Sequence, residues 1–198
     1  MKIDTLELGP IQTNCYIVYI EGANEAVVID PAGEPEKIKK ALDGKKAAAV
    51  LLTHGHFDHT GALSAFAGTP IYMHPSDDVM LLDPVWSVGD MVGDTEPRPA
   101  ATDYVQEGAK LHLAGLDITV LHTPGHTLGS VCYQIGDVLF TGDTMFSGSY
   151  GRTDFPGGDE AELFRSLRRL LKLDKDYIVC PGHGGPTSIF QERELYSR

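Results

Sequence analysis

The segment 53–60, with the sequence THGHFDHT, constrains this chain more than any other segment. It carries three histidines and one aspartate, and it directly follows the apolar run 47–52, which predicts a buried β-strand. Polar side chains gathered at the end of a buried strand are unfavourable to desolvate unless a cation draws them together. A solvated polar turn explains a single histidine. This cluster instead predicts a metal site, and neutral histidine with aspartate suits zinc, iron or manganese.

The length of 198 residues predicts one domain, residues 1–198, with enough chain for a substantial core. A net charge of −12 leaves no basic surface for phosphates, so nucleic acid is not expected as a partner. The first residues lack the apolar core of a secretory signal, and no apolar run is long enough to span a membrane. We therefore expect a cytoplasmic protein with no membrane partner. Three widely spaced cysteines, Cys15, Cys132 and Cys180, predict buried thiols rather than a disulfide framework or a zinc site.

Strand and helix patterns follow one another in an order that predicts two sheets. Strands are expected over 3–8, 14–19, 25–30, 47–52 and 71–73, with helices after Pro35 and over 61–67. Further strands are expected over 111–114, 117–121, 130–135, 138–141 and 177–180, with a helix that begins at Asp159 and has Glu162 in a capping box. Two mixed sheets packed face to face with helices outside accommodate this order, which predicts an α+β fold, an αββα sandwich.

The segment 74–107 differs from the rest of the chain. Prolines and glycines interrupt it, and it contains one helical piece near 76–82 and the only tryptophan, Trp86. A segment of this length with little regular structure inside a compact domain is typical of a functional cap. We expect it near the mouth of the active site.

Three later turns resemble the first cluster in kind. His126, Asp143 and His183 each lie beside glycine in a turn that follows an apolar strand. Turns at strand ends can converge on one site, and glycine lets the backbone approach closely. The remaining histidines, His74, His112 and His122, show no spacing that pairs them with these residues, and we expect them to be structural or solvated.

Seven such side chains are too many for one tetrahedral ion and fit two ions that share a carboxylate. We expect one ion at His54, His56 and His126, a second at Asp58, His59 and His183, and Asp143 as the bridge. Two divalent cations offset by two carboxylates leave a net positive site, which favours a bound hydroxide. Such a site predicts hydrolysis, with Asp58 and Asp143 as the catalytic carboxylates.

The chain resembles the metallo-β-lactamase superfamily in its segment 53–59 and in the later Gly-His-Thr, Gly-Asp-Thr and Gly-His-Gly turns. The sequences TNCY at 13–16 and GRTDFPGGD at 151–159 are similar to those of the single-domain glyoxalase II-like hydrolases, and the resemblance covers nearly the whole chain. It implies an αββα sandwich and hydrolysis of a small anionic thioester, such as S-lactoylglutathione, by a metal-bridging hydroxide. Zinc is the expected metal, with iron or manganese as alternatives.

Differences from other families of the superfamily narrow the range of activities that the resemblance implies. Secreted zinc β-lactamases have a cysteine ligand where this chain has Asp143, so lactamase activity is not expected, and flavodiiron proteins have a glutamate at the position of His56. Glyoxalase II enzymes continue into a helical domain that helps to hold glutathione, whereas fifteen residues follow His183 here. Arg152 matches their basic glutathione contact and predicts a carboxylate clamp, unless it pairs with a nearby acid such as Asp154 or Asp159. Tyr150 is a second candidate for substrate binding.

Two other functions remain open at this point. A persulfide dioxygenase of the same superfamily would use His54, His126 and Asp143 to hold one iron. A metal-stabilised binding module without turnover is disfavoured because all seven ligand positions are filled. The sequence leaves open the thiol carrier, the metal and the oligomeric state.

Overall fold

Two six-stranded mixed sheets form the centre of the computed structural model, which describes residues 1–196. The first sheet holds its strands in chain order, namely β1 (Lys2–Leu8), β2 (Thr13–Tyr19), β3 (Glu25–Ile29), β4 (Lys46–Leu51), β5 (Ile71–Met73) and β6 (Asp103–Tyr104). The second runs in the order β12 (Thr187–Ser188), β11 (Ile178–Pro181), β10 (Val138–Gly142), β9 (Val131–Ile135), β8 (Leu116–His122) and β7 (Lys110–Leu113). The α1–β4 unit joins parallel strands, whereas β1 to β3 and β7 to β10 are antiparallel.

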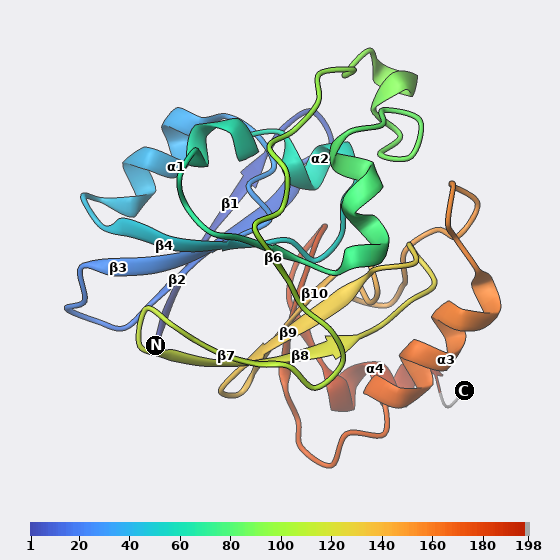
Figure 1. Cartoon of the computed structure of the whole chain (residues 1–198). Coiled ribbons are helices and arrows are strands. Elements are labelled where there is room, and N and C mark those ends of the chain that lie inside the picture. The colour runs from blue at the N-terminus through green and yellow to red at the C-terminus, as the bar shows by residue number, and fades with distance from the viewer. Residues whose placement is uncertain (197–198) are drawn as a thin grey trace.

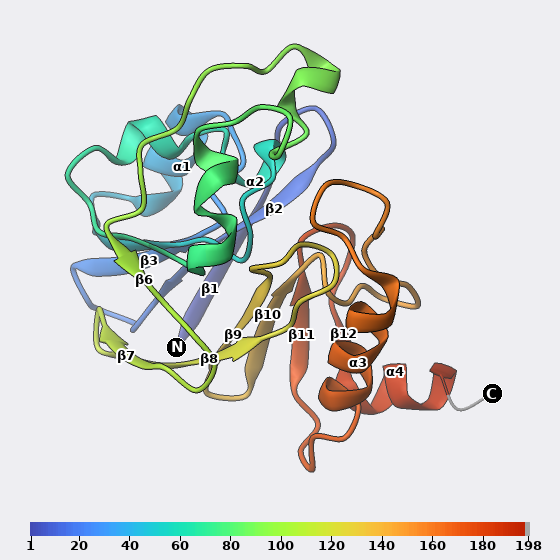
Figure 2. The same ribbon diagram turned by 45° about the vertical axis from the view of Figure 1, so that its right-hand side comes forward.

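Helices cover the outer faces of both sheets (Figures 1 and 2). The helical segments are α1 (Pro35–Leu42), α2 (Phe57–Thr60), α3 (Glu160–Leu170) and α4 (Ile189–Tyr196), with 3-10 turns η1 (Leu63–Phe66), η2 (Pro75–Leu81) and η3 (Gly89–Val92). Among the described residues no helix is long and apolar enough to cross a membrane. The layer order of helix, sheet, sheet and helix confirms the predicted αββα sandwich.

Alternation along the strands builds three separate apolar layers. In β2, Ile17 packs with Ile38 of α1, whereas the neighbouring Val18 points into the layer between the two sheets. In β10, Phe140 lies between the sheets and Leu139 packs against α3. Successive side chains of a strand face opposite sides, so each sheet is apolar on both faces and is covered on both. The three cysteines lie buried and unpaired in these layers, as predicted.

The helix expected at Asp159 begins there, because the Asp159 carboxylate accepts a 2.9 Å hydrogen bond from the Glu162 N–H. The helix expected over 61–67 is wrong in extent, since only the single 3-10 turn η1 forms before Gly68 takes a positive φ of 84°. The short strands β6 and β12 and the helix α4 were not predicted. Two-residue strands carry too little alternation to be recognised from sequence.

Backbone hydrogen bonds tie the two sheets together at one end. The N–H of Val131 donates to the Thr53 carbonyl at 2.8 Å, and the N–H of Asn14 donates to the Gly182 carbonyl at 2.7 Å. The strands β4, β10 and β11 all end at this edge, so their following turns meet there. This arrangement gathers the polar turns of the sequence on one side of the molecule.

Candidate metal centre

The segment after β4 delivers its four polar side chains to the interior. His54 and His56 lie on an extended loop, and the chain then enters α2, whose first turn carries Asp58 and His59. All four are buried, with exposed fractions between 0% and 8%. Glycine is required at position 55, because a Cβ there would lie 2.5 Å from the Met80 Cβ. The loop therefore passes close beneath η2 on its way to α2.

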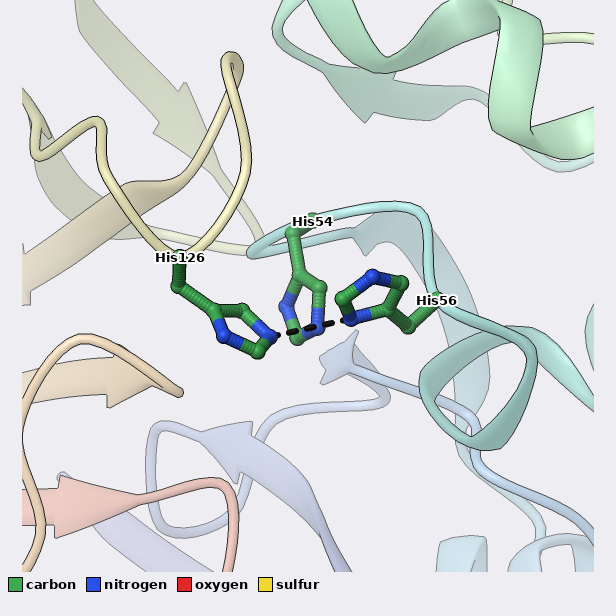
Figure 3. A group of neighbouring side chains, drawn as sticks. All are labelled: His54, His56 and His126. Atoms are coloured by element: carbon green, nitrogen blue, oxygen red, sulfur yellow. Dashed lines mark hydrogen bonds between the residues drawn. The ribbon is translucent and has the colours of Figure 1, made fainter. Parts of the chain in front are cut away.

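His54, His56 and His126 form the first group of ligand atoms, all within 4.8 Å of one another (Figure 3). The Nδ1 of His56 lies 2.9 Å from the Nε2 of His126, and the His54 ring meets both neighbouring rings edge to face. A cation between them would use the lone pairs of both nitrogens, whereas a hydrogen bond uses only one.

Asp58, His59 and His183 form the second group. The Asp58 Oδ2 lies 3.3 Å from the Nε2 atoms of both His59 and His183. Asp143 faces both groups, since its Oδ1 lies 3.2 Å from His59 Nε2 and its Oδ2 lies 3.6 Å from His126 Nε2. The structure thus brings the seven side chains together, and His54, His59 and Asp143 form a further group of ligand atoms between the other two. Their division between two ions stays a prediction.

Several buried polar atoms in this cluster lack a hydrogen-bond partner among the described residues. They are the Nε2 atoms of His54, His56 and His59 and the Oδ1 of Asp143. Buried polar atoms are rarely left unsatisfied in folded proteins, and a cluster of them is typical of an ion-binding site. Imidazole nitrogens and carboxylate oxygens are ligands for zinc, iron and manganese. The residues present therefore fit a pair of divalent cations.

Burial and nearby charges shift the pKa values of the histidines in the two groups in opposite directions. Burial, reinforced by the neighbouring histidines, lowers the pKa of His54, and burial with the nearby His126 lowers the pKa of His56 to about 3. Burial also acts to lower the pKa of His59, but Asp58, Asp143 and Asp30 outweigh it and raise that pKa. The first group is therefore neutral and ready to coordinate, while the carboxylates surround the second group.

Asp30 supports the second group from outside, a role that the sequence analysis missed. Its Oδ2 lies 2.9 Å from His59 Nδ1 and accepts a 2.7 Å hydrogen bond from the Thr53 hydroxyl, while its Oδ1 accepts from the Thr53 N–H at 2.8 Å. A carboxylate behind a ligating histidine fixes the ring orientation and raises its basicity. An aspartate directly after the buried strand 25–29 was a signal that could have found it.

Asp77 is a second residue that the sequence analysis missed. It lies in η2, is 0% exposed, and accepts hydrogen bonds of 2.6 Å from both the Thr127 hydroxyl and the Gly129 N–H. It thereby ties the segment 74–107 to the loop that carries His126. Burial raises the pKa of Asp77 to about 6 against the opposing effect of these hydrogen bonds.

A cavity of about 450 Å³ opens above the cluster. Its floor includes Asp58, His126, Asp143 and His183, and its walls include Ile11, Val88, Met91, Val92, Phe146, Arg152 and Phe155. Three of these wall residues, Val88, Met91 and Val92, belong to the segment 74–107. The same segment is bonded to α2, because the Ser87 carbonyl accepts a 3.0 Å hydrogen bond from the Phe57 N–H. This segment, green in Figure 1, therefore reaches the cavity mouth as predicted.

Of the two residues expected to bind substrate, Arg152 lies in the described lining of the cavity and Tyr150 does not. Arg152 lines the cavity, but its guanidinium pairs with Asp154, the acid that the sequence analysis had named as one possible partner. Tyr150 packs edge-on against Phe164, with ring centroids 5.1 Å apart, and the described cavity lining does not include it. Its contact with substrate stays a prediction.

The other three histidines lie outside the cluster. His74 stacks on His122 with ring centroids 4.2 Å apart, and His112 is exposed and lies 2.8 Å from an Asp117 oxygen. None of them belongs to a described group of ligand atoms. They occupy structural or solvated positions, as expected.

A family model described as the Metallo-beta-lactamase superfamily matches residues 8–183, a span that contains all seven ligand-type residues. The chain belongs to the metallo-beta-lactamase superfamily. The predicted superfamily membership is therefore confirmed. With its cluster of metal-ligand residues, the chain is a metal-dependent hydrolase of this superfamily.

Curated relatives and solved structures match this superfamily member over nearly its full length. It is 36% identical to the hydroxyacylglutathione hydrolase GloC of Haemophilus influenzae, over 98% of this chain and 95% of the relative. The BLEG-1 B3 metallo-beta-lactamase structure matches with a TM-score of 0.91 and 37% identity, over 98% of this chain and 97% of that one. TTHA1623, solved in a di-iron-bound form, matches with a TM-score of 0.86 and 38% identity, over 97% of this chain and 98% of that one.

Proposed function

We propose that this chain hydrolyses a small thioester such as S-lactoylglutathione, in the manner of the glyoxalase II-like enzymes. The observation that carries the proposal is the pair of ligand groups joined by Asp143 at the floor of an open cavity. Two adjacent divalent ions suit hydrolysis of an acyl bond. The similarity to GloC supports a thioester as the substrate.

The residues that would hold the first ion are His54, His56 and His126, and those for the second are Asp58, His59 and His183, with Asp143 shared. When bound, the ions would supply an activated water molecule and polarise the carbonyl of the substrate. In the reaction the water oxygen bonds to the acyl carbon, the carbon–sulfur bond breaks, and the sulfur leaves as a thiol after it gains a proton.

Asp58 is held in place for this chemistry by the chain itself. The Thr13 hydroxyl donates a 2.7 Å hydrogen bond to its Oδ2, and both residues are buried. Burial acts to raise the pKa of Asp58, but the attraction of His59 and the hydrogen bonds from His183 and Thr13 outweigh it and lower that pKa. Asp58 therefore stays ionised, as a ligand and as an anchor for the attacking water.

Zinc is our first expectation for the metal, and the donor set accommodates iron or manganese equally well. The similarity to TTHA1623, which has a di-iron-bound form, makes iron the main alternative. Metal analysis of protein purified without added metal decides between them. We expect about two divalent ions per chain.

A persulfide dioxygenase is the second candidate, because His126 Nε2 lies 3.6 Å from Asp143 Oδ2, close enough to share one iron with His54. That assignment leaves Asp58, His59 and His183 without a metal although they converge within ligand distance. The convergence supports the hydrolase. Oxygen uptake with glutathione persulfide tests the alternative directly.

The test of the proposed function is the loss of thioester absorbance of S-lactoylglutathione with purified protein, with chelator-treated protein and with zinc-restored protein. We expect loss that stops with the chelator and returns with zinc. Nitrocefin is the comparison substrate, because BLEG-1 is named as a lactamase, and we expect no cleavage. Failure of every metal-restored sample to cleave any thioester contradicts the proposal.

A further inference from the structure

The wall of the cavity above the metal cluster carries apolar side chains that are exposed to solvent. Met91 and Val92 are 70% and 58% exposed, and Ile11, from the turn between β1 and β2, is 50% exposed. All three line the cavity, and we call them the lip. Exposed apolar side chains gathered around a cavity commonly mark a surface that a ligand covers.

The segment that carries Met91 and Val92 of the lip is hydrogen-bonded to the helix α2 of the metal cluster. Val88 is buried and adopts a positive φ of 65°, which is a strained backbone conformation for a β-branched residue. The neighbouring Ser87 carbonyl accepts the hydrogen bond from Phe57, which adjoins Asp58. Strain of this kind persists only where the surrounding structure enforces it. The backbone that presents Met91 and Val92 to the cavity is therefore fixed by the surrounding structure.

Arg152 is the only lysine or arginine in the described lining of the cavity, and it is already engaged. Its Nε and Nη2 donate to the two carboxylate oxygens of Asp154 at 2.6 and 2.7 Å, and its guanidinium lies 3.9 Å from the centroid of the Phe155 ring. A substrate carboxylate must displace a partner that is tethered two residues away and therefore present at high effective concentration. The pair also has no net charge with which to attract an anion.

The lip and the engaged arginine point to the same kind of thiol. We infer that the part of the thioester next to the sulfur is uncharged and apolar, as in a pantetheine-type or N-acylcysteamine arm, and is covered by the lip. This inference rests on the proposed thioester hydrolysis and specifies the carrier. Glutathione carries two carboxylates near its sulfur, and the described lining of this cavity offers them no lysine or arginine that lacks a carboxylate partner. Any charge on the carrier lies beyond the lip.

The first experiment compares two carriers of the same acyl group, S-lactoyl-N-acetylcysteamine and S-lactoylglutathione, with the zinc-loaded protein. We expect kcat/KM to be higher for the uncharged carrier by about tenfold, the effect of covering one apolar side chain. Equal values, or a preference for glutathione, overturn the inference and leave the proposed function standing. Hydrolysis of neither compound overturns both.

The second experiment places a charge on the lip. Met91→Asp should lower kcat/KM for the uncharged carrier by about tenfold, and its high exposure makes it compatible with folding. Leu82→Asp is the matched control, since Leu82 is 60% exposed in the same segment and does not line the cavity. An equal response of the two variants overturns the role of the lip.

The third experiment releases the arginine. Asp154→Asn removes the charged partner of Arg152, so the ratio of kcat/KM for the glutathione carrier to that for the uncharged carrier should rise about fivefold, in keeping with an exposed ion pair. An unchanged ratio overturns the part assigned to Asp154.

Discussion

The Asp77 carboxylate accepts a 2.6 Å hydrogen bond from the Thr127 hydroxyl, across fifty positions of the chain. The same carboxylate accepts from the Gly129 N–H, so one buried side chain holds the loop that follows His126. This contact joins the segment 74–107, which forms part of the cavity wall, to the loop that carries His126 of the first ligand group.

Replacement of Asp77 by alanine should therefore weaken both the fold and the metal centre. The buried Gly129 N–H loses its partner and the Thr127 hydroxyl loses one of its two, so the free energy of unfolding should fall by about 3 kcal/mol. The His126 loop should loosen, and one ion should be lost at lower chelator concentration. Denaturant unfolding and metal analysis measure the two effects. Ser76→Ala, at an exposed neighbouring position, is the control, and an equal result for both variants contradicts this role.

The pKa of Asp77 predicts a pH effect of defined sign. Because this pKa is about 6 in the folded protein and near 3.8 in the unfolded chain, the folded state holds the proton more tightly. The stabilisation is fully present below the unfolded pKa and is lost as the pH rises through about 6. From about pH 4 to about pH 7, the unfolding free energy of the wild type should fall by about 2–3 kcal/mol relative to Asp77→Asn, which does not titrate. Urea unfolding at several pH values tests this, and parallel pH curves for the two proteins contradict it.

Asp30→Asn should weaken metal binding while the fold is kept. The carboxylate lies against His59 Nδ1 and also accepts two hydrogen bonds from Thr53, so asparagine preserves the shape but not the charge behind the histidine. Loss of such a partner lowers metal affinity by about 10-fold to 100-fold. Competition with a chromophoric chelator measures the affinity. Asp43→Asn is the control, because Asp43, like Asp30, has a positive φ, but it is exposed and belongs to none of the ligand groups. Wild-type affinity in Asp30→Asn contradicts the role of Asp30.

Asp58→Ala should leave the chain with one ion and little activity. Asp58 contributes its Oδ2 to the second group, within 3.3 Å of both His59 and His183. Its removal should lower turnover of the thioester by roughly three orders of magnitude, since the second ion contributes several kcal/mol to the reaction. Metal counting and steady-state kinetics are measured on the same sample, with the exposed Asp117→Ala as the control. Near-normal turnover with a single ion contradicts the dinuclear reaction.

The parts of this structure that were predictable from sequence are those whose signal is local. The ligand-type residues of 53–60 lie within one turn and α2, and the apolar runs of β2 and β10 predict two buried strands. The roles of Asp30 and Asp77 depend on partners 29 and 50 positions away, so no spacing reveals them. The pairing of Arg152 with Asp154 was one of several open choices, because two acids lie nearby and only rotamers decide between them.

Gly125 shows how closely the His126 loop is fitted to α3. Its φ is +131°, and a Cβ at this position would lie 2.1 Å from the backbone nitrogen of Leu163. Gly125→Ala must therefore push the loop away from α3 and carry His126 out of the first group, with a loss of about 3 kcal/mol or more in unfolding free energy. Gly136→Ala is the matched control, because Gly136 has a positive φ of 58° and open space around it, so only backbone strain of about 1–2 kcal/mol applies.

The two glycine variants separate strain from displacement when stability and metal content are measured together. Gly136→Ala should lower the unfolding free energy and retain both ions, because its turn between β9 and β10 lies away from the ligand loops. Gly125→Ala should lose the first ion as well as stability, since His126 follows it directly and supplies one of the three ligand atoms there. If Gly125→Ala retains both ions at wild-type affinity, the contact between α3 and the loop does not position His126. The geometry of the first group would then depend on His54 and His56, which follow β4.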